Sequence, residues 1–309
     1  MTPLVPSVGV FGAGAVGQAV GGALVAAGLC GRLLVTSRTI EQAQALADDL
    51  DDMRTALGSP VLPGAAEAED LRACAAVVIA VRAQFANTRS TDVRMGGIQA
   101  NAPVVRDLAE QLSGYPGTVL VVTNPVDLMT RWFAEESGCS RVFGIGSSLD
   151  SARYRLTLGR LLGVPADAVS GRVIGEHGDT SVVCASSTLV NDQSVPVPLQ
   201  QVRDELDRRP GRINIGIGRT RCGPAGAVLS ALRLALGAED GTTELCAPHA
   251  GDWCGIPVRF TGGDPLPFSP PLDSVEDRQL EASRTKLRAA YQAARGVPLQ
   301  PSPSGRKSP

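Results

Sequence analysis

Three short segments of the sequence carry residue types that could act together in chemistry. The first, 12–17 (GAGAVG), follows an apolar run at 8–11 and opens a helical pattern. Glycines at these spacings permit a tight turn, a close approach of the backbone to a pyrophosphate, and close helix–strand packing. The free N–H groups that begin the helix then attract the phosphates. In a chain with 35 glycines the motif alone is weak, but its strand–turn–helix setting favours a dinucleotide site over a plain turn.

The second segment, 175–180 (GEHGDT), contains His177, one of only two histidines. Histidine is the side chain best suited to exchange a proton near neutral pH, and the flanking glycines leave its ring accessible. Taken alone, the segment is better interpreted as a loop with a hydrogen-bonded histidine. In the third segment, Asp150 and Arg153 share a face if the chain is helical there. They fit a carboxylate that orients an imidazole and a guanidinium that binds a substrate carboxylate, or simply a surface ion pair.

The first half of the chain predicts a scaffold for these segments. Apolar runs rich in Val, Ile and Leu alternate with helical patterns, which is typical of βαβ units with parallel strands covered on both faces. The expected strands are 8–11, 33–36, 76–81, 118–122 and 141–145, and the expected helices are 16–27, 41–53, 102–112 and 128–136.

The pattern changes after about Asp150. Helices are expected at 151–162, 202–208, 225–236 and 275–294, with β-like segments at 173–174 and 182–190. We therefore expect an α/β fold in three parts. These are a dinucleotide-binding domain with a doubly wound parallel sheet (1–148), an α+β substrate domain (149–296), and a disordered tail rich in Pro and Ser (297–309).

Composition narrows the function classes. With 29 basic and 31 acidic residues and no basic cluster, neither nucleic acid nor a membrane surface is an expected partner. No apolar run reaches the ~18–20 residues of a spanning helix, and the N-terminus does not resemble a signal peptide. Seven cysteines without C-x-x-C spacing predict reduced thiols and a cytoplasmic location. Cys246, His249 and Cys254 are too irregularly spaced for zinc and are interpreted as loop residues, so no metal is expected.

Together, the motifs VGVFGAGAVGQAV, VVTNPVDLMT, LDSARYR and IGEHGDTSV resemble those of the L-lactate/malate dehydrogenase family. The resemblance covers nearly the whole chain. It implies a Rossmann domain, a small 2-oxo or 2-hydroxy acid as substrate, and a homodimer or homotetramer. It also implies a nicotinamide coenzyme at the glycine-rich loop, whose binding residues would be Gly12, Gly14, Ala15, Val16 and Gly17.

The resemblance further implies a role for residues at matching positions. His177 would be the acid/base, and Asp150 would hold its ring and raise its pKa. Arg153 would bind the substrate carboxylate. Asn124 would contact the substrate beside the nicotinamide, and Thr220 would line the substrate pocket.

A mobile loop after the strand at 76–81 supplies, in this family, an arginine that polarises the carbonyl, and Arg89 fits that role. Malate enzymes carry a further arginine six residues earlier, where lactate enzymes carry a glutamine. Direct counting here leads to Ala83, and a shift of one residue brings in Arg82 or Gln84. We favour Arg82 as a second carboxylate binder, and hence an oxaloacetate- or malate-like substrate over pyruvate.

The end of the second strand bears on the coenzyme. Family members that use NAD carry an aspartate there, which binds the adenosine ribose. Here Ser37 is the best match and Arg38 follows it, with Thr36 and Thr39 as further hydroxyls. A neutral hydroxyl and a guanidinium favour the 2′-phosphate of NADPH.

The leading hypothesis is therefore an NADPH-dependent, malate-like 2-oxo acid reductase. A second keeps the enzyme class but changes the substrate to a monocarboxylic or unusual 2-oxo acid of specialised metabolism. A third is a catalytically silent NADP-binding sensor protein. The intact set of His177, Asp150, Arg153 and Arg89 argues against the third.

Overall fold

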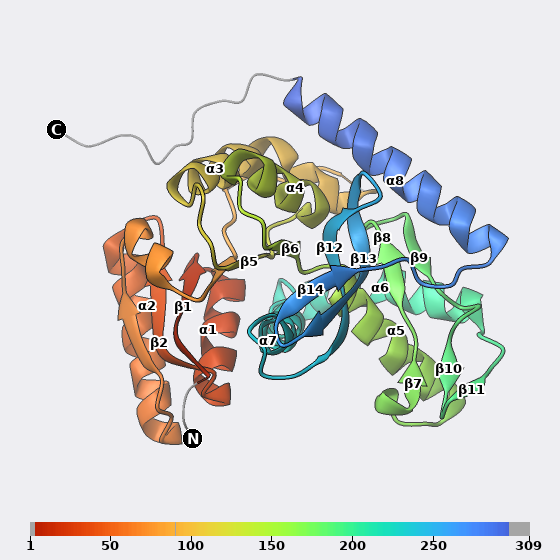
Figure 1. Ribbon diagram of the computed structural model, residues 1–309, viewed down its shortest axis with the longest axis horizontal. Helices are drawn as coiled ribbons and strands as arrows, with labels where there is room; N and C mark the ends of the chain where they lie inside the picture. Colours follow the sequence, from red (N-terminus) through yellow and green to blue (C-terminus); the bar gives the residue numbers. More distant parts are fainter. Residues whose placement is uncertain (1–3, 90, 297–309) are drawn as a thin grey trace.

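One sheet organises most of the chain in the computed structural model, which describes residues 4–89 and 91–296 (Figure 1). Its first six strands are parallel and lie in the order β3-β2-β1-β4-β5-β6. Their bounds are β1 Val5–Phe11, β2 Cys30–Thr36, β3 Leu62–Ala65, β4 Ala76–Ile79, β5 Thr118–Val121 and β6 Val142–Gly144. The order reverses between β1 and β4, and in such sheets ligands bind beyond the strand ends at that reversal.

Helices cover both faces of this sheet (Figure 1). One face packs against α1 (Ala15–Ala27), α2 (Ile40–Leu57) and α7 (Cys222–Ala235). The other packs against α3 (Ile98–Gln111), α4 (Val126–Ser137) and α8 (Ser274–Arg295). Alternate residues of β4 and β5 enter the two cores, so these strands are buried throughout and show no polar alternation.

The α/β scaffold expected for the first half is confirmed. Each predicted strand and helix there overlaps an observed one, with ends that differ by a few residues. The sequence pattern missed β3, whose residues are only partly buried, and two 3₁₀ helices, η1 (Ala68–Ala73) and η2 (Val93–Gly97).

The second half extends the same sheet in antiparallel fashion, in the order β12-β13-β8-β9, with β14 beside β13. A separate small sheet contains β11, β10 and β7, in that order. The bounds are α5 Ser147–Leu162, η3 Ala166–Ala168, β7 Val169–Ser170, β8 Val173–Gly175, β9 Ser181–Val183, β10 Leu189–Val190, β11 Gln193–Ser194, α6 Leu199–Ile217, β12 Gly241–His249, β13 Asp252–Thr261 and β14 Asp264–Pro267.

The hairpin of β12 and β13 corrects one expectation. Cys246, His249 and Cys254 are not loop residues, because all three lie in its strands, and both cysteines are buried. The hairpin forms because β12 pairs with β6 at Cys246 and β13 pairs with β8 at Gly255, so that sheet neighbours stabilise it on both sides.

Helix α6 corrects a second expectation. It was predicted over 202–208, ending before Pro210, but it continues through the proline to Ile217. Glu205 accepts hydrogen bonds from Arg209 at 3.1 Å and from Arg212 at 2.6 Å, and thereby joins the turns on both sides of the proline.

Four further expectations concern the domain boundary, the C-terminal tail, membrane-spanning helices and the cysteines. The boundary at residue 148 falls in the first turn of α5, and the main sheet runs across it, so the domain division stays a prediction. The tail at 297–309 lies outside the described residues. No described helix is long and apolar enough to cross a membrane, and all seven cysteines are free thiols.

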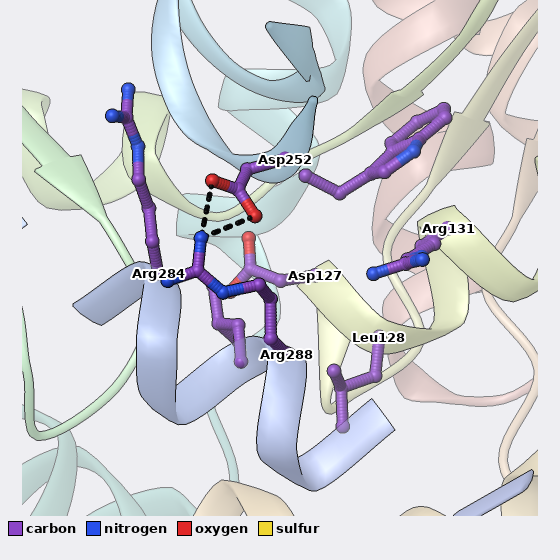
Figure 2. A pocket seen from close by; sticks show the side chains of 8 residues that line it. Asp127, Leu128, Arg131, Asp252, Arg284 and Arg288 are labelled. Carbon is purple, nitrogen blue, oxygen red and sulfur yellow. Dashed lines mark hydrogen bonds and ion pairs between the residues drawn. The ribbon is translucent and has the colours of Figure 1, made fainter. Parts of the chain in front are cut away.

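Asp127, in the first turn of α4, is a carboxylate buried in the protein interior. Its Oδ2 accepts a hydrogen bond from the backbone N–H of His177 at 2.8 Å, whereas Oδ1 has no partner among the described residues. Figure 2 shows Asp127 beside a small cavity between α4 and α8, where Arg288 pairs with Asp252 and not with Asp127. Burial raises the pKa of Asp127 to about 7.

This shift predicts how stability depends on pH. An unfolded aspartate titrates near pH 4, so between about pH 4 and pH 7 the folded state holds a proton that the unfolded state has lost. The wild type should lose up to about 4 kcal/mol of unfolding free energy as the pH rises through that window. Asp127→Asn keeps an acceptor for His177 and removes the loss, so its stability advantage should grow between pH 5 and pH 8.

Urea unfolding at the two pH values measures this advantage. Asp49→Asn, the same change on the exposed face of α2, serves as the control. An advantage that is equal at both pH values would show that Asp127 stays ionised throughout.

Candidate active site

The glycine-rich loop between β1 and α1 has the shape of a phosphate cradle. Gly12 has a φ of +111°, and a Cβ there would lie 2.7 Å from the carbonyl oxygen of Ala80. A Cβ on Gly17 would overlap the carbonyl oxygen of Gly12. A Cβ on Gly14 would meet nothing within 4 Å, and no side chain caps α1. The loop therefore leaves an open space in front of free backbone N–H groups, which include those of the first turn at Ala15 and Val16.

The end of β2 lies beside this loop. The Oγ of Ser37 accepts a hydrogen bond from the N–H of Ala13 at 3.4 Å and donates one to Gln42. The hydroxyls of Thr36 and Thr39 already have protein partners, because Thr36 donates to the carbonyl of Ala66 and Thr39 caps α2 by accepting the N–H of Gln42. Arg38 is exposed and forms no ion pair with any described residue.

The structure brings His177 and Asp150 together in the protein interior. The Nδ1 of His177 lies 2.5 Å from Oδ2 of Asp150, and the two residues are 8% and 9% exposed. Asp150 lies in the first turn of α5, and His177 follows β8. The carboxylate therefore holds the imidazole at Nδ1, and Nε2 is left to contact a ligand.

Several elements fix the position of His177. The Oγ of Ser151 on α5 bonds to both the N–H and the carbonyl of Val173 on β8. Asp127 on α4 accepts the His177 N–H, and Ser283 on α8 accepts the N–H of Glu176 at 2.7 Å. The turn that carries the histidine is therefore held from three helices.

Arg153 completes a buried cluster. Its Nη1 lies 3.3 Å from Oδ1 of Asp150, and the residue is 6% exposed. Burial opposes the ionised form of Asp150, but the charges of His177, Arg94 and Arg153 outweigh it and lower the Asp150 pKa. The pKa of Arg153 is lowered as well, by burial first and then by Arg94 and Arg209, against the attraction of Asp150.

The pKa of His177 differs from the expectation. It is lowered, because burial and the positive charge of Arg94 outweigh the attraction of Asp150. Asp150 does favour the charged ring, as expected, but its effect is not the largest. In the ligand-free protein the imidazole is therefore neutral at pH 7.

The sequence analysis missed Arg94, an arginine of the loop after β4 whose positive charge acts on this cluster. Arg94 lies in η2, and its charge acts on His177, Asp150 and Arg153. Arg89 is half exposed and pairs with Asp92 at 3.4 Å. A signal was present in the sequence, because Arg94 lies four residues before the start of α3, closer to that helix than Arg89 does.

Asn124 follows β5, and its backbone connects to the loop after β4. The Nδ2 of Asn101 donates to the carbonyl of Asn124 at 2.7 Å, and its Oδ1 accepts from the N–H of Ala83 at 2.9 Å. The guanidinium of Arg82 stacks on the ring of Phe85, 4.4 Å from its centroid.

Arg82 and Thr220 come from distant parts of the sequence to the same region. The pKa of Arg82 is lowered by loss of solvent and by the charge of Arg219, the neighbour of Thr220. Thr220 also lies next to Gly223, where a Cβ would meet Leu149 of α5 at 3.0 Å. The segment between α6 and α7 therefore faces both the β4 loop and the start of α5. Gln84 is exposed.

Among residues 4–89 and 91–296, no group of three or more His, Cys, Asp or Glu side chains could hold a metal ion. The sequence analysis also missed Arg209, Glu176 and Lys286. Arg209 lies in α6, Lys286 lies in α8 and Glu176 follows β8. Only their contacts in the folded chain identify these charged residues as neighbours of the site.

Comparison with known proteins identifies the family. Residues 7–144 match the model of the lactate/malate dehydrogenase NAD-binding domain. L-lactate dehydrogenase of Deinococcus radiodurans is 32% identical over 311 residues, which covers 92% of this chain and 98% of that enzyme. Other alignments are shorter. L-lactate dehydrogenase of Staphylococcus epidermidis (31%) matches 60% of this chain, and L-2-hydroxycarboxylate dehydrogenase (NAD(P)(+)) of Methanocaldococcus jannaschii (31%) matches 53%. The chain thus spans only 58% and 55% of these two relatives.

Solved structures share the fold. The minor L-lactate dehydrogenase of Enterococcus mundtii has a TM-score of 0.87 at 22% identity, with 96% of this chain and 100% of that chain covered. Malate dehydrogenase of Cryptosporidium parvum has a TM-score of 0.85 at 22% identity, with 94% and 99% covered. The full-length match to the Deinococcus enzyme shows that the chain belongs to the lactate/malate dehydrogenase family, the NAD(P)-dependent dehydrogenases that act on CH–OH groups.

Proposed function

We propose that this chain reduces a 2-oxo acid to the 2-hydroxy acid with NADPH as coenzyme. The observation that carries the proposal is the buried contact of His177 with Asp150, surrounded by the charges of Arg153 and Arg94. This arrangement can bind a carboxylate and protonate an oxygen beside it. A coenzyme whose pyrophosphate is held by the glycine-rich loop would supply the hydride from its nicotinamide.

Each side chain has a distinct part in this chemistry. Arg153 forks onto the substrate carboxylate and so orients the ketone. Arg94, in place of Arg89, faces the charge that develops on the carbonyl oxygen. His177 donates the proton from Nε2 while Asp150 holds Nδ1, and Asn124 and Thr220 line the pocket.

Protonation of His177 accompanies substrate binding in this proposal. The positive charges of Arg94 and Arg153 lower its pKa in the ligand-free protein. A substrate carboxylate between those guanidinium groups offsets their charge, so the imidazole gains its proton when the substrate anion arrives.

For the substrate, we propose a dicarboxylic, oxaloacetate-like 2-oxo acid. Arg82 and Arg219 lie close enough for their charges to repel, and neither pairs with a carboxylate among the described residues. A second substrate carboxylate would relieve that repulsion. Most of the similar enzymes named above act on lactate by name, so a monocarboxylic 2-oxo acid is the second candidate.

For the coenzyme, the support is the absence of a carboxylate at the end of β2. Ser37 lies beside the phosphate cradle, and Arg38 is free to meet a 2′-phosphate. The Methanocaldococcus relative is named for use of both coenzymes. We also place the protein in the cytoplasm, in keeping with its free thiols, as a homodimer or homotetramer; both stay predictions.

A panel of 2-oxo acids, followed by NADPH absorbance, tests the function. We expect oxaloacetate to be reduced with a higher kcat/KM than pyruvate. His177→Asn should lower turnover roughly 10²–10⁴-fold because the general acid is lost, while NADPH still binds. Equal turnover in a folded variant would remove His177 from the chemistry.

Arg82→Gln makes the substrate test specific. The variant should lose activity toward oxaloacetate and keep its activity toward pyruvate, because only the former has a second carboxylate. A wild type that prefers pyruvate, or equal losses on both acids, would favour the monocarboxylic candidate.

Arg94→Gln tests which arginine faces the carbonyl. Removing the charge should raise the pKa of His177 in the ligand-free protein and lower kcat/KM roughly 10²–10³-fold. Arg89→Gln, the same change in the same loop, should alter both quantities little. The pKa is measured by NMR titration, where only two histidines contribute and His177→Asn assigns the signal.

A larger loss of kcat/KM in Arg89→Gln than in Arg94→Gln would contradict this assignment. It would show that Arg89 polarises the substrate carbonyl, as expected from the sequence.

Coenzyme choice is tested by steady-state kinetics with both coenzymes. NADPH should be preferred ~30–1,000-fold, because a repulsive carboxylate is absent and a guanidinium–phosphate contact is gained. The double variant Ser37→Asp, Arg38→Ala should reverse the preference. Arg54→Ala, which removes a charge from the far end of α2, is the matched control. A kcat/KM for NADH at or above that for NADPH in the wild type contradicts the proposal.

A further inference from the structure

Lys286 on α8 connects the loop that carries Arg94 to the turn that carries His177. Its Nζ lies 2.8 Å from Oδ1 of Asp92, and 2.8 and 2.9 Å from the two carboxylate oxygens of Glu176. Asp92 comes from the segment after β4, and Glu176 directly precedes the histidine. One ammonium group therefore joins three elements that are remote in the sequence.

The Glu176 end of this contact is rigid. The Glu176 side chain is 2% exposed, and Thr180 donates to it through both its N–H and its hydroxyl. Ser283, one turn before Lys286 on α8, accepts the N–H of Glu176. A carboxylate held in this way gives the lysine a fixed anchor next to the active site.

The Asp92 end of this contact belongs to the segment that carries Arg94. Asp92 has a φ of +49°, the left-handed region, and immediately precedes η2, in which Arg94 lies. Its N–H donates to Asp179 at 2.9 Å, and its side chain also contacts Arg89. The segment in which Arg94 lies is therefore held by the contacts of Asp92 with Lys286 and Asp179, together with the hydrogen bond from Asn87 to the carbonyl of Val93.

We propose that Lys286 is a positioning residue, which holds Asp92 against Glu176 and so fixes the segment that carries Arg94 beside the turn that carries His177. The inference rests on the proposed role of Arg94. It requires two features of the contact, a positive charge at position 286 and a carboxylate at position 92. The favourable charge contacts outweigh the cost of partly burying the ammonium and raise the pKa of Lys286, so the charge persists through the neutral range.

Kinetics provide the first test. Asp92→Asn leaves the Glu176 anchor intact and suits the left-handed backbone. Both Asp92→Asn and Lys286→Met should raise KM for the 2-oxo acid and lower kcat, with kcat/KM reduced roughly three- to tenfold, while NADPH affinity is unchanged. The double variant should be little worse than either single variant, and Lys286→Arg should restore most of the activity.

A second readout separates positioning from simple loss of charge. Asp92→Asn removes a negative charge, whose direct effect would lower the pKa of His177. If the variant releases Arg94, that pKa should rise instead. NMR titration of the ligand-free protein measures the sign without any turnover, and the Arg94→Gln shift gives the maximum that release can produce.

Arg278→Met, which removes an exposed charge from the same helix, is the matched control and should change nothing. The proposal is overturned if Asp92→Asn lowers or leaves the His177 pKa, or if both variants keep wild-type kinetics. If no 2-oxo acid is reduced but the pKa still rises, the proposed function fails and the positioning role stands.

Discussion

The contact between Asp150 and His177 is the constraint on which the rest of the site depends. A carboxylate and an imidazole at 2.5 Å, both buried, are stable only if each has its partner, because a lone buried charge costs several kcal/mol. Helix α5 and the turn after β8 must therefore be held in register. Ser151 provides this by bonding to both backbone groups of Val173. The hairpin β12–β13 also holds the site in register. It pairs with β6 on one side and with β8 on the other, so that the sheet is continuous up to the site.

The charges around this pair do not balance. Asp150 faces two guanidinium groups, Arg153 and Arg94, so the ligand-free cluster is positive and keeps the imidazole neutral. An anion of the proposed substrate class would correct the imbalance and allow the ring to take up its proton. Binding of the substrate anion would then also favour protonation of His177. A neutral ketone would gain neither the contacts of the carboxylate nor the protonated imidazole. Burial raises the pKa of Asp127, on the other side of the turn, to about 7, so near neutral pH this group carries less than a full negative charge beside His177.

The sequence was most informative where one local pattern decides the structure. The glycine-rich loop, the buried parallel strands and the motifs around Asp150 and His177 each carry their signal within a few residues. It failed where tertiary contacts decide. Cys254 was expected in a loop, yet sheet pairing places it in β13, a strand of ten residues. The helix predicted over 202–208 continues to Ile217, because Glu205 holds the turns on both sides of Pro210. Thr36 and Thr39 were expected to offer hydroxyls to a coenzyme, yet both hydroxyls already bond to backbone groups. The choice between Arg89 and Arg94 depends on the path of a loop, which counting residues does not determine.

The loop after β4 differs physically from every other element of the site. Asp150 and Arg153 lie in α5, whose backbone hydrogen bonds would have to break before they could move, and the turn of His177 is held by buried contacts with Asp127 and Ser283. Arg94 lies in the short η2, which contacts the rest of the site through side chains, Asp92 with Lys286 and Asn87 with the carbonyl of Val93. Substitutions in this loop can therefore change which group faces the far end of a substrate without disturbing the proton donor.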